Sequence, residues 1–252
     1  MSVARPREVV LVHSSDLHLG PDSGFGAAYP FASLSHLREV LAVAVSVRAD
    51  LVVLAGDTFD NNRQNSKLLE RTAEILTEHS GPIVVLPGNH DPLTPDSVYR
   101  RAELGVASNL CVLGLTVEEA VVFEGLELEV WGRAHMDYFD MSPLRKPRSR
   151  STRWQLAAAH GHYVDEPKEP SRFLGSWLIL PDELIATGAD YVALGHWNRA
   201  ENVGNGRIHA YYSGSPEYAG TVNVVRLRLD GTIEVTRDPL PGGNGARPSD
   251  RD

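Results

Sequence analysis

Apolar runs and amphipathic stretches alternate along the first 90 positions of the chain. Apolar runs typical of strands buried on both faces occur at Val9–Val12, within Asp50–Ala55 and at Ile83–Leu86. Apolar residues three and four apart predict a helix from Leu34 to Val45, and residues 66–79 have the pattern of a second helix. This βαβαβ order implies a parallel sheet with right-handed crossovers, in which ligands bind beyond the carboxyl ends of the strands.

The remainder of the chain is richer in strand patterns. Thr94-Pro95 predicts the start of one more helix, which Gly105 would end. Further strands are expected at Leu110–Leu113, Ala120–Phe123, Leu126–Trp131, Gln155–Ala159, Tyr191–Leu194, His209–Ser213, Val222–Leu229 and Ile233–Val235. Residues 141–153 are basic and aperiodic and are expected to form a mobile loop. One domain is expected over residues 1–238, followed by a disordered tail at 239–252.

Composition narrows the class of protein. The 252 residues suffice for one α/β domain, and a 42% hydrophobic content is ordinary for a protein with a sizeable core. A net charge of -9 repels a polyanion such as nucleic acid at long range. Bound metal ions or a local basic patch would offset this repulsion. Cys111 is the single cysteine, which excludes an intrachain disulfide. The apolar stretches are too short for a secretory signal or a membrane span, so we expect a cytoplasmic protein with no membrane partner.

Polar clusters follow five of the expected strands. They are Ser15–His18, Gly56–Asp57, Gly88–Asp91, His160–His162 and Gly195–Asn198. Because each follows an apolar strand directly, their side chains should point into one shared cleft, with Asp16 and His18 on the same side of an extended segment. Gly88 and Gly195 are expected to allow backbone turns that a side chain would block. Carboxylates, imidazoles and an amide suit Mn²⁺, Fe or Zn²⁺ better than Ca²⁺ or Mg²⁺.

The order Asp-x-His, Gly-Asp, Gly-Asn-His-Asp, His and Gly-His over residues 8–216 resembles the calcineurin-like metallophosphoesterase superfamily. Within it, Gly56–Asp60 and Tyr212–Glu217 look most like the DNA-repair exonuclease branch, the SbcCD-type nucleases. The resemblance implies a four-layer α/β/β/α sandwich with two mixed sheets. It also implies a dinuclear metal site at the carboxyl ends of the strands.

Carried over residue by residue, the resemblance implies a role for each polar side chain. Two divalent ions are implied, Mn²⁺ first, with Fe or Zn²⁺ as alternatives. The implied ligands are Asp16 and His18 for metal one, Asp57 as the bridge, and Asn89, His160 and His196 for metal two. His90 would protonate the leaving oxygen, with Asp91 orienting it.

The chain departs from the family pattern at Asn198, where a second histidine usually completes metal one. An amide oxygen ligates weakly, so metal one would be labile or more oxygen-rich, unless Asn198 contacts substrate instead. His162 or His209 would be a substitute, but neither fits the position of the motif. His135 follows a strand and is a further candidate for the cleft. His162 is a candidate for a hydrogen-bond partner of the ligands or for a residue that lines the substrate site. Asp60 is expected to cap its loop rather than to bind metal.

The expected function is hydrolysis of phosphodiester bonds by two-metal activation of water, with nucleic acid or nucleotides as substrate. The alternative is a phosphatase or phosphodiesterase acting on a small phosphorylated metabolite. An acidic chain that ends soon after the sheet, without the extra DNA-capping domain of the nuclease branch, favours that alternative. A non-catalytic scaffold is a third hypothesis, based on Asn198 alone.

Overall fold

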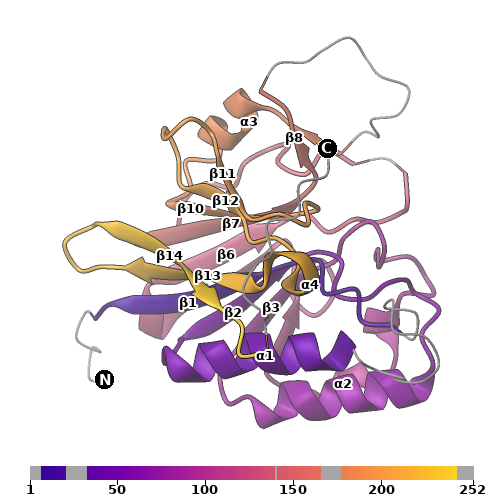
Figure 1. The fold of residues 1–252 in the computed structure, drawn as a ribbon. Coiled ribbons are helices and arrows are strands. Elements are labelled where there is room, and N and C mark those ends of the chain that lie inside the picture. The colour runs from indigo at the N-terminus through magenta and orange to yellow at the C-terminus, as the bar shows by residue number, and fades with distance from the viewer. Residues whose placement is uncertain (1–6, 21–32, 140, 166–176, 243–252) are drawn as a thin grey trace.

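The computed structural model describes residues 7–20, 33–139, 141–165 and 177–242. Two six-stranded sheets pack face to face, as the expected fold class requires (Figure 1). The first sheet has the order β14 (Ile233–Pro239), β13 (Thr221–Leu227), β1 (Val9–Ser14), β2 (Leu51–Ala55), β3 (Ile83–Leu86) and β4 (Leu110–Val112). Strands β1 to β4 are parallel, whereas β13 runs antiparallel to β1 and β14 antiparallel to β13, so the sheet is mixed.

The second sheet is mixed as well. Its order is β11 (Glu201–Val203), β12 (Ala210–Tyr212), β10 (Tyr191–Gly195), β7 (Trp154–His160), β6 (Leu128–Gly132) and β5 (Ala120–Phe123). The four central strands are parallel, and the two edge strands are antiparallel to their neighbours. A parallel pair of two-residue strands, β8 (His162–Tyr163) and β9 (Leu178–Ile179), lies beside the second sheet.

Helices cover the outer faces of the sheets. Figure 1 shows α1 (Ser33–Ser46) and α2 (Ser66–Glu78) on the first sheet, and the short α3 (Pro181–Ala186) on the far side of the second. The apolar stripe of α1 is buried as its spacing predicts, and Asn65 caps α2 by accepting the Leu68 N–H at 2.9 Å. Every residue of β1, β2 and β3 is buried, because helices cover one face of these strands and the second sheet the other.

The helix expected from Thr94 to Gly105 is absent from this part of the structure. Two 3₁₀ turns, Val98–Arg100 and Leu104–Val106, take its place. The Val98 N–H, which a helix would bond to residue 94, is instead accepted by Asn62 Oδ1 at 3.0 Å. A tertiary hydrogen bond therefore replaces a helical one in this segment.

Smaller differences occur towards the carboxyl end of the chain. Residues 141–153 form neither helix nor strand, and Arg148 and Arg150 within them pair with Glu129 and Asp190. Strand β14 continues to Pro239, and Leu240 behind it is buried. The rest of the expected tail, residues 243–252, lies outside the described residues. Among the helices that the structure describes, none has the length and apolarity needed to cross a membrane.

Candidate metal centre

The carboxyl ends of β1, β2, β3, β7 and β10 meet where the two sheets face each other, and the polar clusters follow these ends. Backbone hydrogen bonds join neighbouring loops of the first sheet: the Asp16 N–H donates to Gly56 O at 3.0 Å. Side chains join the two sheets, since His160 Nδ1 lies 3.0 Å from Ala55 O. The expected shared edge is therefore formed by residues from both sheets.

Glycines set the spacing at this edge. A Cβ added to Gly195 would lie 1.9 Å from Ala55 O on the facing sheet, and one added to Gly88 would lie 2.1 Å from Asp57 Oδ1. A side chain would be blocked at both positions, as expected, but neither residue has a positive φ, so the cause is close contact with neighbouring atoms. They are needed because the neighbouring atoms leave no room for a side chain.

Four of the expected ligands have a strained backbone. Their φ angles are positive, 54° at Asp16, 45° at His18, 49° at Asp57 and 104° at His196. Side-chain-bearing residues rarely adopt such angles, and each costs on the order of 1–3 kcal/mol unless the surroundings impose it. Strain of this kind concentrates at functional sites, where it aims side chains that a relaxed backbone would direct elsewhere.

Asp57 and His160 form the buried centre of the site. His160 Nε2 lies 3.0 Å from Asp57 Oδ2 and 3.0 Å from Asn89 Oδ1, and both Asp57 and His160 are fully enclosed. Burial alone would lower the pKa of His160, but the facing Asp57 carboxylate raises it to about 9. Burial likewise opposes ionisation of Asp57, yet the His160, His90 and His18 imidazoles hold its pKa below the usual range. The two shifts agree on a charged pair.

Asp16 connects this centre to the loop after β10. Its two oxygens accept the His196 N–H at 3.1 and 2.9 Å, and Ser15 Oγ donates to Oδ2 at 2.5 Å. Burial nevertheless raises the pKa of Asp16 to about 6, and the nearby Asp57 charge adds to the effect. Burial lowers the pKa of His196 to about 4, which leaves that imidazole neutral and able to donate a lone pair at neutral pH.

Among the described residues, two groups of donor atoms that contain Asp57 could each hold a metal ion. The first contains Asp57, His160 and His196, and the second contains Asp16, His18 and Asp57, with the atoms of each group within 4.8 Å of one another. Asp57 belongs to both groups. The chemistry fits a pair of divalent cations, because buried carboxylates and imidazoles are transition-metal ligands and the raised pKa of Asp16 reflects a charge that burial leaves poorly compensated. His160, which is protonated opposite Asp57, would release its Nε2 proton on binding a metal ion.

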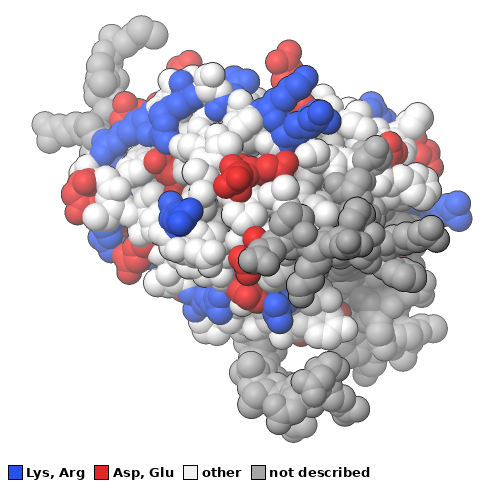
Figure 2. Space-filling model, turned by 90° about the horizontal axis from the view of Figure 1, so that it is seen from above, with Lys and Arg blue, Asp and Glu red and all other residues white. Residues whose placement is uncertain are grey.

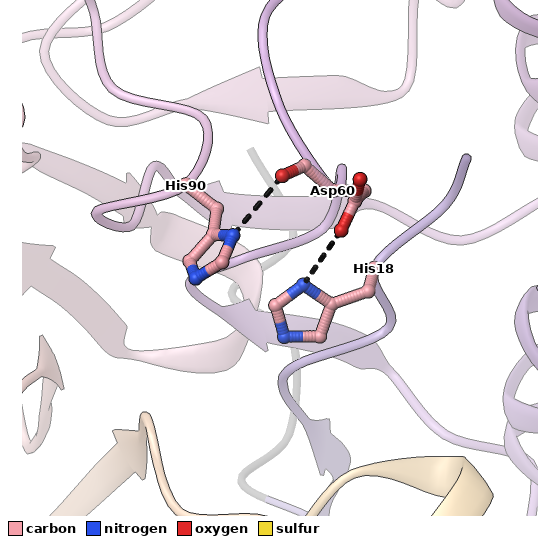
Figure 3. Close-up of side chains that lie close together, drawn as sticks. All are labelled: His18, Asp60 and His90. Carbon is pink, nitrogen blue, oxygen red and sulfur yellow. Dashed lines mark hydrogen bonds and ion pairs between the residues drawn. The ribbon is translucent and has the colours of Figure 1, made fainter. Parts of the chain in front are cut away.

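A third cluster, which the sequence did not predict, lies beside the second group. Figure 3 shows Asp60 between His18 and His90. Its carboxylate oxygen lies 3.8 Å from His18 Nδ1, and its backbone oxygen lies 3.0 Å from His90 Nδ1. Asp60 was expected only to cap its loop. The one sequence signal for this wider role is its position three residues after Asp57, on the same loop.

Asp91 contacts different groups from those expected. Its oxygens accept the Gly88 N–H at 2.7 Å, the Phe59 N–H at 2.9 Å and the Tyr99 hydroxyl at 2.6 Å. The ring of His90 is hydrogen-bonded to Asp60 instead. The expectation that Asp91 orients the His90 ring therefore needs correcting: Asp91 ties together the backbones of the two loops that carry Asp57 and His90.

The structure separates the remaining candidates. His209 precedes β12, which is parallel to β10, so it lies at the opposite end of the sheet from His196. His135 is buried beneath the site, where its Nε2 lies 2.9 Å from His160 O. His162 Nδ1 accepts the Trp197 indole N–H at 3.0 Å. Asn198 is exposed, and its backbone oxygen accepts the Ser215 N–H at 3.1 Å.

The chain is similar in sequence to known proteins. A sequence model of the calcineurin-like phosphoesterases matches residues 9–227. The SbcD subunit of nuclease SbcCD from Bacillus subtilis is 27% identical over 242 residues, covering 82% of this chain and 61% of that protein. DNA double-strand break repair protein Mre11 of Archaeoglobus fulgidus is 26% identical over 256 residues, covering 93% of this chain and 55% of that protein. The chain thus spans between half and two thirds of the length of these two relatives.

Solved structures give the same fold. The crystal structure of TT1561 of Thermus thermophilus superposes with a TM-score of 0.55 at 14% identity, covering 92% of this chain and 99% of that one. At this identity the likeness concerns the fold alone.

Proposed function

The chain belongs to the calcineurin-like phosphoesterase family, and on that premise we propose that it is a metal-dependent phosphodiesterase acting on nucleic acid or nucleotides. The observation that carries the proposal is the pair of donor groups that share Asp57. One bridging carboxylate is the arrangement that holds two dications at the separation of about 3.5–4 Å found in two-metal hydrolases.

The donor groups suggest how the ligands are divided. Asp16 and His18 would hold metal one, Asn89, His160 and His196 would hold metal two, and Asp57 would hold both. We propose Mn²⁺ as the ion, with Fe or Zn²⁺ as alternatives, because the set mixes imidazole with oxygen donors. Bound divalent ions supply Lewis acidity, which activates water and neutralises charge on the phosphoryl oxygens.

The protein's own groups orient the reaction. His90 is exposed at the rim of the site, and its Nδ1 is engaged by Asp60 O, so Nε2 is the ring atom left to protonate a departing oxygen. The backbone N–H of His90 donates to Asp57 Oδ1 at 2.9 Å, which couples the position of the acid to that of the bridge. Asp60 positions His18 and His90 together, from its side chain and its backbone respectively.

Two observations bear on the substrate. The relatives named above are nucleases and DNA-repair proteins, which favours a phosphodiester in nucleic acid. Figure 2 shows basic and acidic side chains interspersed on the face seen from above, and Arg148 and Arg150 of the basic segment 141–153 already pair with Glu129 and Asp190. Internal pairing of these arginines weakens their attraction for a duplex. It supports, as second candidate, a small phosphorylated metabolite.

A substrate panel tests the proposal. Metal-free protein would be supplied with Mn²⁺ and assayed on single-stranded DNA, duplex ends, bis-p-nitrophenyl phosphate and p-nitrophenyl phosphate, each with and without excess chelator. The proposal expects chelator-sensitive cleavage of the diesters. Cleavage of the monoester alone would select the metabolite phosphatase, and no hydrolysis of any substrate would indicate a scaffold.

A further inference from the structure

An open hollow of about 560 Å³ lies next to the candidate metal centre. The described residues that line it are His162, Tyr163, His196, Trp197, Asn198 and Arg199. His196 belongs to the first donor group, so one wall of the hollow is shared with the metal centre. The volume falls within the range of about 300–1,000 Å³ that is usual for small-molecule sites. A substrate whose phosphate reached the metals would therefore place its neighbouring group in this hollow.

The floor of the hollow is a tryptophan held in a fixed orientation. The Trp197 ring stacks on buried Tyr212, with centroids 4.3 Å apart and an interplanar angle of 8°. Its indole N–H donates to His162 Nδ1 at 3.0 Å. The stacking contact and the hydrogen bond together fix the plane of this half-buried ring where it meets the hollow.

A cation lies over the same ring. The Arg199 guanidinium carbon is 5.0 Å from the Trp197 centroid, and its side chain is 74% exposed. Glu201 Oε2 holds Arg199 Nε at 2.8 Å, which steadies the guanidinium without burying it. Tyr212 and the guanidinium thus both lie against the Trp197 ring, and the planar face offered to the hollow is that of the exposed guanidinium, backed by the ring.

We propose that Trp197 and Arg199 form a base-binding shelf, which seats the nucleoside next to the scissile phosphate. The inference rests on the proposed phosphodiesterase function and names the part of the substrate that gives it specificity. A planar guanidinium backed by an aromatic ring can stack on any nucleobase, largely independently of its identity. A flexible aliphatic alcohol or a sugar phosphate offers no flat face to match, so the shelf favours nucleotide-containing esters over other phosphodiesters.

Two esters with the same leaving group separate this inference from the function it rests on. The Mn²⁺-loaded protein would be assayed on p-nitrophenyl thymidine 5′-phosphate and on methyl p-nitrophenyl phosphate. In each, water forms a new bond to phosphorus and the bond to p-nitrophenolate breaks, leaving thymidine monophosphate or methyl phosphate. Because the chemistry and the colour signal are identical, the ratio of the two kcat/KM values reports only the nucleoside. We expect a ratio of at least about fivefold, the lower end of what one base–aromatic stack contributes.

Variants of the two shelf residues then show whether these residues cause the preference for the thymidine ester. Trp197→Leu and Arg199→Ala should each lower the ratio towards one, whereas Trp197→Phe, which keeps a ring but loses the hydrogen bond to His162, should retain most of it. Arg71→Ala is the matched control, because Arg71 is an exposed arginine paired with Glu74 on α2, away from the hollow. If Trp197→Leu fails to fold, the exposed Arg199 decides the question alone.

The possible failures differ. Hydrolysis of both esters at similar efficiency by the unaltered protein, or a preference that survives Trp197→Leu and Arg199→Ala, would overturn the shelf and leave the phosphodiesterase function standing. Hydrolysis of neither ester would overturn that function, and the shelf with it.

Discussion

Asp57 presents one oxygen to His160 and the other to the His90 backbone N–H, and it belongs to both donor groups. Its positive φ and full burial are costs that a residue with a purely structural role would rarely carry. At the scale of single residues, the site is therefore a set of strained and buried polar groups that hold one another in place before any ligand binds.

His90 differs from these groups because it is exposed and is absent from both donor groups that contain Asp57. We predict that His90→Ala keeps its full metal content while the rate falls, by about 10²–10⁴-fold if the ring acts as a general acid. The loss should be smaller for p-nitrophenyl esters than for DNA, because a good leaving group needs little protonation. Elemental analysis alongside kinetics checks this, and a variant that loses metal would make His90 a ligand.

Asn198 stands where the family resemblance leads us to expect a second histidine, and its side chain is exposed to solvent. We predict that titration of Mn²⁺ into the metal-free protein shows two separated affinities. Asn198→His should then tighten the weaker one, because an imidazole nitrogen is a better donor than an amide oxygen. Asn198→Ala is the matched control and should leave the weaker affinity low.

Turnover measured on the same Asn198→His variant separates two roles. If Asn198 is only a weak ligand, activity at limiting metal should rise with affinity. If it contacts substrate in the hollow beside Trp197, affinity should rise while turnover falls. Unchanged affinity and unchanged turnover together would place Asn198 outside the site.

At the scale of elements, the site depends on how closely β10 approaches β2. Gly195 has space for a hydrogen only, since a Cβ would meet Ala55 O. We predict that Gly195→Ala lowers the free energy of unfolding by about 1–3 kcal/mol, as overpacking usually does, and weakens Mn²⁺ binding because His196 moves with it. Gly105→Ala is the control, since a Cβ there meets no atom within 4 Å. Denaturant unfolding and metal titration of both variants check this; wild-type values in Gly195→Ala would show that the spacing is not required.

A second inter-sheet contact predicts a pH dependence. His13 on β1 is buried, with Nδ1 2.9 Å from the Tyr191 hydroxyl on β10, and burial lowers its pKa to about 3. Between pH 3 and about pH 6.5 the unfolded chain binds a proton at His13 that the folded chain excludes. The contribution of His13 to the free energy of unfolding is therefore fully present above about pH 6.5 and is lost as the pH falls.

The size of this effect is measurable. Because of His13, the free energy of unfolding should fall by up to about 1.4 kcal/mol for each pH unit between pH 6.5 and 4.5. His13→Gln, which does not titrate, should lack that share of the slope, as measured by urea unfolding across the range. Equal slopes in the two proteins would mean that His13 is protonated in the folded state.

The elements that carry the site were predictable from sequence for a physical reason. Strands buried on both faces must be apolar throughout, so β1, β2 and β3 stand out, and the polar residues that follow them mark their ends. The turns at 98–106 were not predictable, because they depend on the distant side chain of Asn62. The contacts of Asp91 with Tyr99 and Phe59, and the place of Asp60 between two histidines, likewise require the loops to be assembled first.

At the scale of the whole molecule, two mixed sheets bring together five strand ends that lie up to 180 residues apart, as the Asp16–His196 contact shows. The fold class expected from the sequence is confirmed, and most of the expected ligands fall into two groups around one carboxylate. The central claim is therefore that the molecule holds two metal ions through Asp57.

Metal stoichiometry tests that claim most directly. Metal-free protein and its Asp57→Ala variant would be titrated with Mn²⁺ by calorimetry, with Asp96→Ala as a control that removes an exposed aspartate. We predict two ions per chain for the unaltered protein and the control, and loss of both high-affinity sites, with nearly all phosphodiester turnover, in Asp57→Ala. Two tightly bound ions in Asp57→Ala, or a single ion in the unaltered protein, would contradict the dinuclear centre.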